Sequence, residues 1–165
     1  MDKKTFLHNL GGGLACLAMP SSVRGEKHDD QYLIKPIYPD KLKRGDIVGI
    51  ICPSSAIDGE LPFMLAQETL EALGNKVKWG KHAHKRLGHL AGNDKGKLDD
   101  LHDMFKDKQI KAVVCIRGGS GAARLLDKID YNLIKRNPKI FLGYSDITAL
   151  HAAIQRKTGL ITFHG

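Results

Sequence analysis

Apolar residues follow two alternating patterns from about residue 41 onward. Short continuous apolar runs such as Ile47–Cys52 and Ile110–Ile116 are typical of strands that are covered on both faces of a sheet. Between them lie longer stretches with apolar positions at helical spacing. One of these, Leu61–Leu73, is followed by Gly74 and Asn75, which suit a helix C-terminus. The alternation predicts an α/β fold with a parallel sheet and helices on both faces.

The predicted strands are Ile47–Cys52, Lys76–Trp79, Ile110–Ile116, Lys139–Gly143 and one that begins at Leu160–Phe163. The predicted helices are Leu61–Leu73, Lys97–Lys108, Ala122–Ile129, Tyr131–Arg136 and Asp146–Arg156. In parallel sheets, function concentrates in the loops at the carboxyl ends of the strands. Three such loops stand out: Pro53–Ser55, Arg117–Gly121 and Tyr144–Asp146. We expect these loops to lie close together.

The first 25 residues differ from the rest of the chain. Lys3 and Lys4 precede a short apolar run, Leu10–Met19, that Pro20 ends. A positive start and a short apolar core predict a secretory signal peptide with cleavage after Gly25, and the run is too short to span a bilayer. A disordered glycine-rich N-terminus is the alternative. Residues 26–40 are predicted as a polar linker, and residues 41–165 as one domain.

Charge and cysteine content narrow the function classes. The formal net charge is +8, but the lysines are spread along the chain and do not alternate with aromatic residues, so we predict no nucleic-acid binding. Cys52 and Cys115 lie within predicted strands, which favours buried free thiols over a disulfide. The histidines between positions 82 and 89 have irregular spacing, and no metal site is predicted there.

Ser145 carries the most specific chemical prediction. The chain passes from the strand that ends at Gly143 into the helix that begins at Asp146 with only a tight turn between them. A serine in such a turn is the setting of a nucleophile elbow, with the amide of the next residue, Asp146, directed at the developing oxyanion. Because Ile147 stands where the common elbow motif has glycine, helix capping by Ser145 or Asp146 is an equal explanation of the segment alone.

The Arg117–Gly121 loop follows a strand and precedes a helix. Its glycines would let the backbone approach a ligand closely, and exposed amides there would cradle an anion. It lacks the spacing of the P-loop and of the dinucleotide fingerprint. A simple tight turn therefore remains an alternative.

Several segments in register resemble the LD-carboxypeptidase (muramoyltetrapeptide carboxypeptidase) family of serine peptidases. The resemblance runs from about Lys41 to the last residue. The matching segments are Leu42–Asp46, Ile50–Ser55, Gly92–Asp94, Arg117–Gly119, Leu125–Asp127, Pro138–Lys139, Gly143–Thr148 and His164–Gly165. The resemblance implies a three-layer, flavodoxin-like domain that forms the N-terminal part of a two-domain enzyme.

The resemblance also implies a Ser–Glu–His triad with Ser145 as the nucleophile. The oxyanion hole would comprise the amide of Asp146 and one from Gly118 or Gly119. The implied reaction removes the terminal D-alanine of a murein tetrapeptide by cutting an L,D amide bond, with no metal or organic cofactor. The family usually has tyrosine after Arg-Gly-Gly, whereas this chain has Ser120. We expect this difference to alter the wall of the substrate pocket.

The family's glutamate and histidine lie in a C-terminal domain that the 165 residues do not include, so we expect this chain alone to be inactive. An immunity-type peptidase that cleaves a peptide–nucleotide antibiotic, and a non-catalytic domain that binds an anion or peptide, are the competing functions. The predicted partners are a murein tetrapeptide, no nucleic acid and no integral membrane segment after signal removal, with a homodimer left open. A periplasmic or exported location follows if residues 1–25 are a signal peptide, and a cytoplasmic one otherwise.

Overall fold

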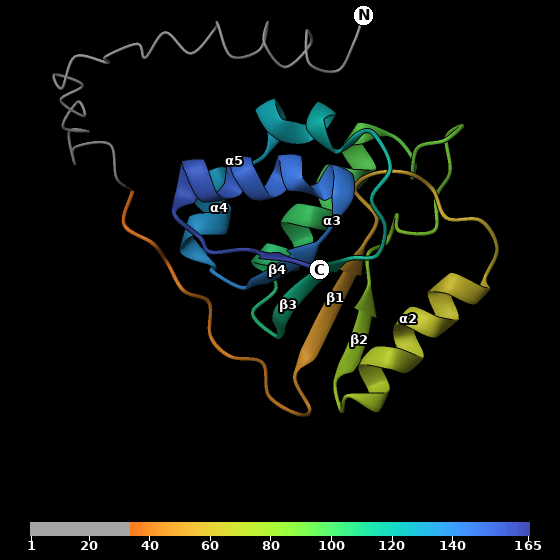
Figure 1. Ribbon diagram of the computed structural model, residues 1–165, viewed down its shortest axis with the longest axis horizontal. Helices are drawn as coiled ribbons and strands as arrows, with labels where there is room; N and C mark the ends of the chain where they lie inside the picture. The colour runs from red at the N-terminus through yellow and green to blue at the C-terminus, as the bar shows by residue number, and fades with distance from the viewer. Residues whose placement is uncertain (1–33) are drawn as a thin grey trace, which may run out of the picture. The chain divides into compact units, whose positions relative to one another are not determined.

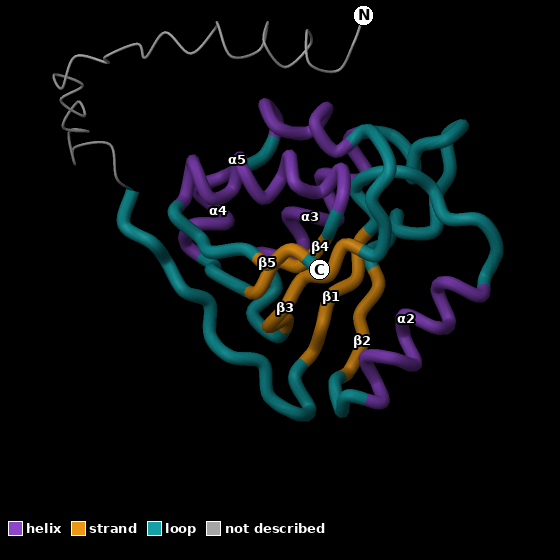
Figure 2. The backbone as a smooth tube through the Cα atoms, in the orientation of Figure 1, coloured by secondary structure: helices purple, strands orange, loops and turns teal. Residues whose placement is uncertain are grey.

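The computed structural model describes residues 34–165 (Figure 1, Figure 2). The signal peptide predicted for residues 1–25 and residues 26–33 of the predicted linker lie outside this range. The strands are β1 (Ile47–Ile51), β2 (Lys76–Trp79), β3 (Ile110–Cys115), β4 (Ile140–Gly143) and β5 (Phe163–His164). The α-helices are α2 (Leu61–Ala72), α3 (Asp94–Lys106), α4 (Tyr131–Arg136) and α5 (Thr148–Thr158). Two 3₁₀ helices complete the fold, η2 (Ala122–Lys128) and η3 (Ser145–Ile147).

The five strands form one parallel sheet in the order β2-β1-β3-β4-β5. This is the flavodoxin-like order, so the predicted fold class is confirmed. β1 and β3 are neighbours although β2 lies between them in the sequence, which makes their boundary the point where the strand order reverses. In such sheets a ligand crevice forms outside the carboxyl ends of the strands at that point.

The two faces of the sheet are covered differently (Figure 1). Helices α3, α4 and α5 cover one face, where α4 contacts both α3 and α5, and the main hydrophobic core lies beneath them, with Phe105, Phe141 and Leu150 fully buried. Helix α2 packs beside β2 on the other face. No helix within residues 34–165 combines the length and apolar character needed to cross a membrane.

Several elements differ from the predictions in their bounds or type, and the predicted helix Asp146–Arg156 is a 3₁₀ turn, η3, followed by α5. Helix α3 begins at Asp94, earlier than the predicted Lys97, because the Asn93 side chain caps it by accepting a hydrogen bond from the amide of Gly96 at 2.8 Å. Residues 122–128 form a 3₁₀ helix. The last strand pairs with β4 through Phe163 and His164, whereas Leu160 forms a separate parallel bridge with Ile37 of the predicted linker.

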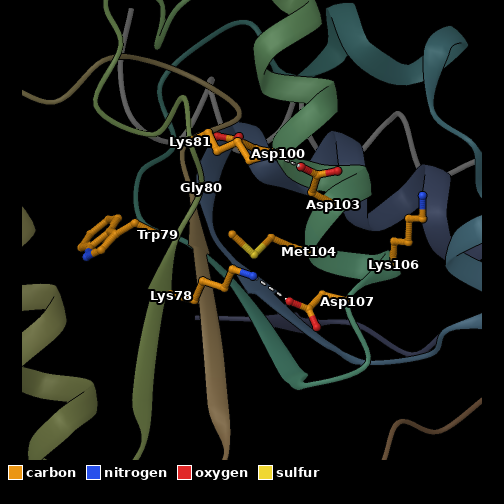
Figure 3. Close-up of a pocket in the computed structure, with 9 residues that line it drawn as sticks. All are labelled: Lys78, Trp79, Gly80, Lys81, Asp100, Asp103, Met104, Lys106 and Asp107. Atoms are coloured by element: carbon orange, nitrogen blue, oxygen red, sulfur yellow. Dashed lines mark hydrogen bonds and ion pairs between the residues drawn. The ribbon is translucent and has the colours of Figure 1, made fainter.

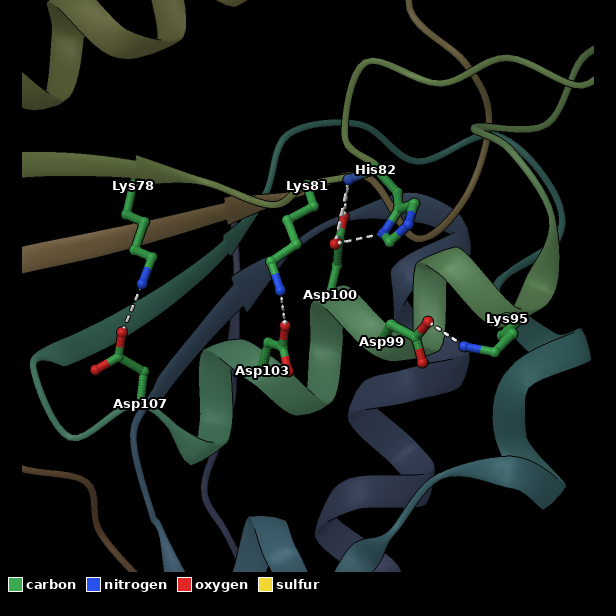
Figure 4. Close-up of polar contacts among 8 residues, drawn as sticks. All are labelled: Lys78, Lys81, His82, Lys95, Asp99, Asp100, Asp103 and Asp107. Atoms are coloured by element: carbon green, nitrogen blue, oxygen red, sulfur yellow. Dashed lines mark hydrogen bonds and ion pairs between the residues drawn. The ribbon is translucent and has the colours of Figure 1, made fainter.

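Ion pairs join α3 to the edge strand β2 and the residues after it (Figure 4). Lys78 pairs with Asp107 at 2.7 Å, and Lys81 pairs with Asp103 at 3.0 Å. These pairs border a cavity of about 240 Å³ between β2 and α3 (Figure 3). Because Lys78 and Lys81 are both paired with carboxylates, we interpret this cavity as a junction between β2 and α3.

Lys139 lies at the amino end of β4, at the opposite end of the sheet from the three predicted loops. Its side chain is buried, and its ammonium donates hydrogen bonds to the carbonyl oxygens of Met104, at 2.7 Å, and Asp107. Carbonyls at a helix C-terminus have no partner within the helix, so Lys139 caps the end of α3. Burial lowers the pKa of Lys139 from 10.5 to about 8.

Candidate active site

The three predicted loops meet at the carboxyl ends of β1, β3 and β4. We refer to Pro53–Ser55, Arg117–Gly121 and Tyr144–Asp146 together as the loop cluster. The amide of Ser55 donates to the carbonyl of Gly118 at 3.3 Å, and the amide of Ser120 donates to the Ser55 hydroxyl at 3.0 Å. The predicted proximity of the loops is therefore confirmed.

The Asp146 side chain links its own turn to the Pro53–Ser55 loop and to Ala122, the residue that directly follows the Arg117–Gly121 loop. One of its carboxylate oxygens accepts a hydrogen bond from the Ser54 hydroxyl at 2.5 Å and another from the amide of Ala122 at 2.8 Å. Ser54 is fully buried, so its hydroxyl needs such a partner. A single carboxylate thus joins the loops that follow β1, β3 and β4.

Ser145 occupies a strained, exposed turn. Its φ of 58° lies in the left-handed region, and no other non-glycine residue within 34–165 has a positive φ. This conformation costs a serine about 1–2 kcal/mol. The turn leads directly from β4 into η3 and α5, and it is closed by a hydrogen bond from the Ile147 amide to the Tyr144 carbonyl at 3.2 Å. This is the strand–turn–helix geometry of a nucleophile elbow.

Helix capping does not account for this turn. The Asp146 carboxylate is directed at Ser54 and Ala122, and the Ser145 hydroxyl has no hydrogen-bond partner among the described residues. The start of the helical segment is instead supported by Thr148, whose hydroxyl donates to the Ser145 carbonyl. The Ser145 hydroxyl is therefore exposed and uncommitted at the N-terminal end of a helical segment, where the backbone dipole favours negative charge.

Gly118 lies directly against the Ser145 turn. A Cβ atom at Gly118 would be 2.7 Å from the Ser145 Cβ and 2.9 Å from the Tyr144 carbonyl oxygen, so only glycine permits this approach. Gly119, with a φ of 113°, packs against the Ser55 side chain. Of the two glycines predicted for an oxyanion hole, Gly118 is the one in contact with Ser145.

His151 supports the elbow from behind. It is buried, and its ring Nε2 donates to the carbonyl of Gly143 at 2.9 Å, which fixes the last residue of β4. Burial lowers the pKa of His151, so the imidazole is neutral at pH 7. Its Nδ1 has no partner in the described part of the chain and points into the protein interior. No imidazole or carboxylate within residues 34–165 hydrogen-bonds to the Ser145 hydroxyl.

Cys52 and Cys115 are buried free thiols, as predicted. Burial raises the pKa of Cys52 to about 11 and also raises that of Cys115 well above its usual range. Because the thiolate is the reactive form, neither residue suits a nucleophilic role at neutral pH.

The histidines of the segment between 82 and 89 do not converge on a common point. His82 pairs through Nδ1 with the buried carboxylate of Asp100 at 2.9 Å (Figure 4), whereas His84 stacks on Phe63 with ring centroids 4.1 Å apart. Within residues 34–165 no group of three or more potential metal ligands comes together.

Two parts of this site were not predicted from the sequence. Asp146 was predicted as a backbone donor or a helix cap, not as a link between loops, and Ser54 had no predicted role. The available clue was the coincidence of Ser54, directly after a buried strand, with an acidic residue in a neighbouring loop. The pattern does not show which side chain accepts which hydrogen bond, because that depends on how adjacent strands are placed.

Comparisons with known proteins agree with this geometry. Residues 48–165 match the LD-carboxypeptidase N-terminal domain. The chain is 50% identical over 127 residues to the "Probable murein peptide carboxypeptidase" of Bacillus subtilis, covering 77% of this chain and 40% of that protein. It is 34% identical to the Microcin C7 self-immunity protein MccF of Escherichia coli, covering 79% of this chain and 38% of that protein.

Among solved structures, the MccF-like protein from Bacillus anthracis superimposes with a TM-score of 0.76 at 40% identity, over 78% of this chain and 40% of that one. The chain thus spans about 40% of the length of the curated relatives it matches. The protein belongs to the LD-carboxypeptidase family and contains the family's N-terminal domain.

Proposed function

We propose that this chain is the nucleophile-bearing domain of a serine peptidase that removes the terminal D-alanine from murein tetrapeptides. The observation that carries the proposal is the left-handed φ of 58° at Ser145, on an exposed turn between β4 and the helical segment. Such strain persists only where the surrounding structure imposes it, and it is common at active sites. In the proposed mechanism the Ser145 Oγ attacks the carbonyl carbon of the L,D amide bond.

The oxyanion that forms in this step is assigned to the backbone around Ser145. The amide of Asp146, the residue after the nucleophile, supplies one donor. The second comes from Gly118 or Gly119. The contact between Gly118 and Ser145 supports Gly118. Fixed amides of this kind typically contribute a factor of about 10²–10³ each to the rate.

We assign the general base to the C-terminal domain that the family resemblance implies, which is not among these 165 residues. His151, which lies behind the Ser145 turn, is buried and already donates to Gly143, and no imidazole within residues 34–165 hydrogen-bonds to the Ser145 hydroxyl. A serine hydroxyl is a weak nucleophile at neutral pH without a base. We therefore expect the chain alone to release no D-alanine at a measurable rate.

The test uses the protein encoded by the complete reading frame that contains this sequence. D-alanine release from a murein tetrapeptide is followed with the unchanged protein and with Ser145→Ala. Removal of the nucleophile should lower the rate by a factor of about 10³ or more. A thermal melt of the variant provides the control for folding. Release at an unchanged rate by a folded Ser145→Ala protein contradicts the assignment of Ser145.

The similarity to MccF supports a second candidate, an immunity-type peptidase that acts on a peptide–nucleotide antibiotic. The higher identity to a murein peptide carboxypeptidase favours the first candidate. Both substrates are offered to the same preparation. Faster cleavage of the peptide–nucleotide than of the tetrapeptide reverses the order of the two candidates, and tight nucleotide binding without cleavage favours a binding domain.

A further inference from the structure

Arg117 is the only cation in the loop cluster. Its side chain is exposed, and it has no ion-pair or hydrogen-bond partner among the described residues. The nearby Arg124 is different: its guanidinium is held by Asp94 through hydrogen bonds of 3.0 and 3.1 Å. Arg117 therefore keeps its full hydrogen-bonding capacity for a ligand.

The position of Arg117 places this charge at the switch point of the sheet. It follows β3 by two residues, at the carboxyl end where the loops after β1 and β3 meet. The positive charge of Arg117 acts on Cys52, which follows β1. Burial raises the pKa of the Cys52 thiol, and Arg117 partly opposes that rise. The crevice at this point is where ligands bind in sheets of this order.

Arg117 is also adjacent in sequence to Gly118, the residue in contact with Ser145. A carboxypeptidase substrate has a matching arrangement. Its terminal carboxylate belongs to the residue directly after the scissile carbonyl, and consecutive Cα atoms are about 3.8 Å apart. Arg117 belongs to the same loop as Gly118, which contacts Ser145, so the loop that borders the nucleophile also carries a cation.

The chemistry of the two groups agrees. A planar guanidinium can donate two parallel hydrogen bonds to a carboxylate, which combines orientation with attraction. Two acidic side chains of this region are already engaged: Asp146 accepts from Ser54 and Ala122, and Asp94 is bound to Arg124. Neither competes for the Arg117 guanidinium in the structure.

We propose that Arg117 binds the free C-terminal carboxylate of the peptide and thereby selects substrates that end next to the scissile bond. This inference rests on the proposed function, since it assumes a peptide seated at Ser145. Arg117 would make the site prefer a terminal residue over a continuing chain.

The experiment measures peptide binding to the 165-residue chain by NMR titration. The probes are N-acetyl-L-lysyl-D-alanine with a free carboxylate and the same dipeptide with a C-terminal amide. The unchanged chain should bind the acid at least about tenfold more tightly than the amide, the size expected for hydrogen bonds between charged groups. Arg117→Gln should bind both forms as weakly as the unchanged chain binds the amide.

Two further variants make the result specific. Arg117→Lys keeps the positive charge but cannot donate two parallel hydrogen bonds to one carboxylate. It should therefore retain only part of the preference for the acid over the amide. Lys85→Gln removes another exposed cation without an ion-pair partner in the described part, from the loop after β2, and should keep the full preference. Equal affinity of the unchanged chain for acid and amide, absence of binding to either, or a preserved preference in Arg117→Gln would overturn the proposal.

The outcome is separable from that of the proposed function. Carboxylate preference that depends on Arg117, together with D-alanine release that survives Ser145→Ala, supports the subsite and rejects the nucleophile. Loss of release in Ser145→Ala, with no Arg117-dependent preference, supports the nucleophile and rejects the subsite.

Discussion

The two ends of the parallel sheet use polar groups in different ways. At the carboxyl end, one carboxylate, Asp146, joins three loops, and a non-glycine residue, Ser145, is held in a left-handed conformation. At the amino end, one buried ammonium, Lys139, satisfies carbonyl oxygens at the end of α3. The first arrangement fixes loops in place at the cost of strain, whereas the second stabilises a helix terminus. The comparison indicates that positional precision is concentrated at the end where a ligand would bind.

The largest effect is expected from the carboxylate that joins the loops. Asp146→Ala leaves the buried Ser54 hydroxyl and the Ala122 amide without their acceptor, which should lower the free energy of unfolding by about 2–4 kcal/mol. Asp146→Asn retains a carbonyl oxygen that can accept both hydrogen bonds and should cost about 1 kcal/mol or less. Urea denaturation of the three proteins measures the difference. Equal losses in the two variants would show that the loops are held by other contacts.

The amino end should give a smaller effect that depends on pH. The folded pKa of Lys139 is about 8, below its value of 10.5 without burial, so the unfolded chain binds more protons between these pH values. The free energy of unfolding should therefore rise with pH across this window, by roughly 1–3 kcal/mol for this group.

Lys139→Met removes the buried titrating group. Comparison with this variant cancels the contribution of the exposed lysines, which titrate in both proteins. The difference in unfolding free energy between the unchanged chain and Lys139→Met should shift in favour of the unchanged chain between about pH 8 and 10.5. A difference that stays constant over this range would show that burial does not disfavour the Lys139 ammonium.

The smallest effect separates strain from chemistry at Ser145. Ser145→Ala and Ser145→Gly both remove the hydroxyl, but only glycine adopts a φ of 58° without strain. Ser145→Gly should therefore be more stable than Ser145→Ala, by about 0.5–1 kcal/mol after the greater unfolded-state entropy of glycine is included. At Ser120, where φ is not positive, the order should reverse. The same order at both positions, measured by thermal unfolding, would argue against strain at the elbow.

The fold could be predicted from local patterns because each strand and helix has its own periodicity. The runs Ile47–Cys52 and Ile110–Ile116 and the helical spacing of Leu61–Leu73 match β1, β3 and α2 closely. The start of α3 was misplaced because its first turn, Asp94-Lys95-Gly96, has no apolar residue, and the Asn93 cap marks it instead. The last strand was misplaced because Leu160, Ile161 and Phe163 are apolar, although pairing with β4 begins only at Phe163.

The sequence by itself determined the α/β class, the three loops and Ser145 as the residue of interest, because these follow from periodicity and from the order of strand, turn and helix. Only the tertiary structure decided that Ser145 is strained, that Gly118 contacts it, and that Asp146 joins Ser54 to Ala122. The physical reason is that these features depend on contacts between loops that meet at one edge of the sheet but are 24–92 residues apart in the chain. Such contacts cannot be predicted from local sequence patterns. For the same reason, the sequence did not distinguish Arg117 from the other basic residues before its place beside Gly118 was known.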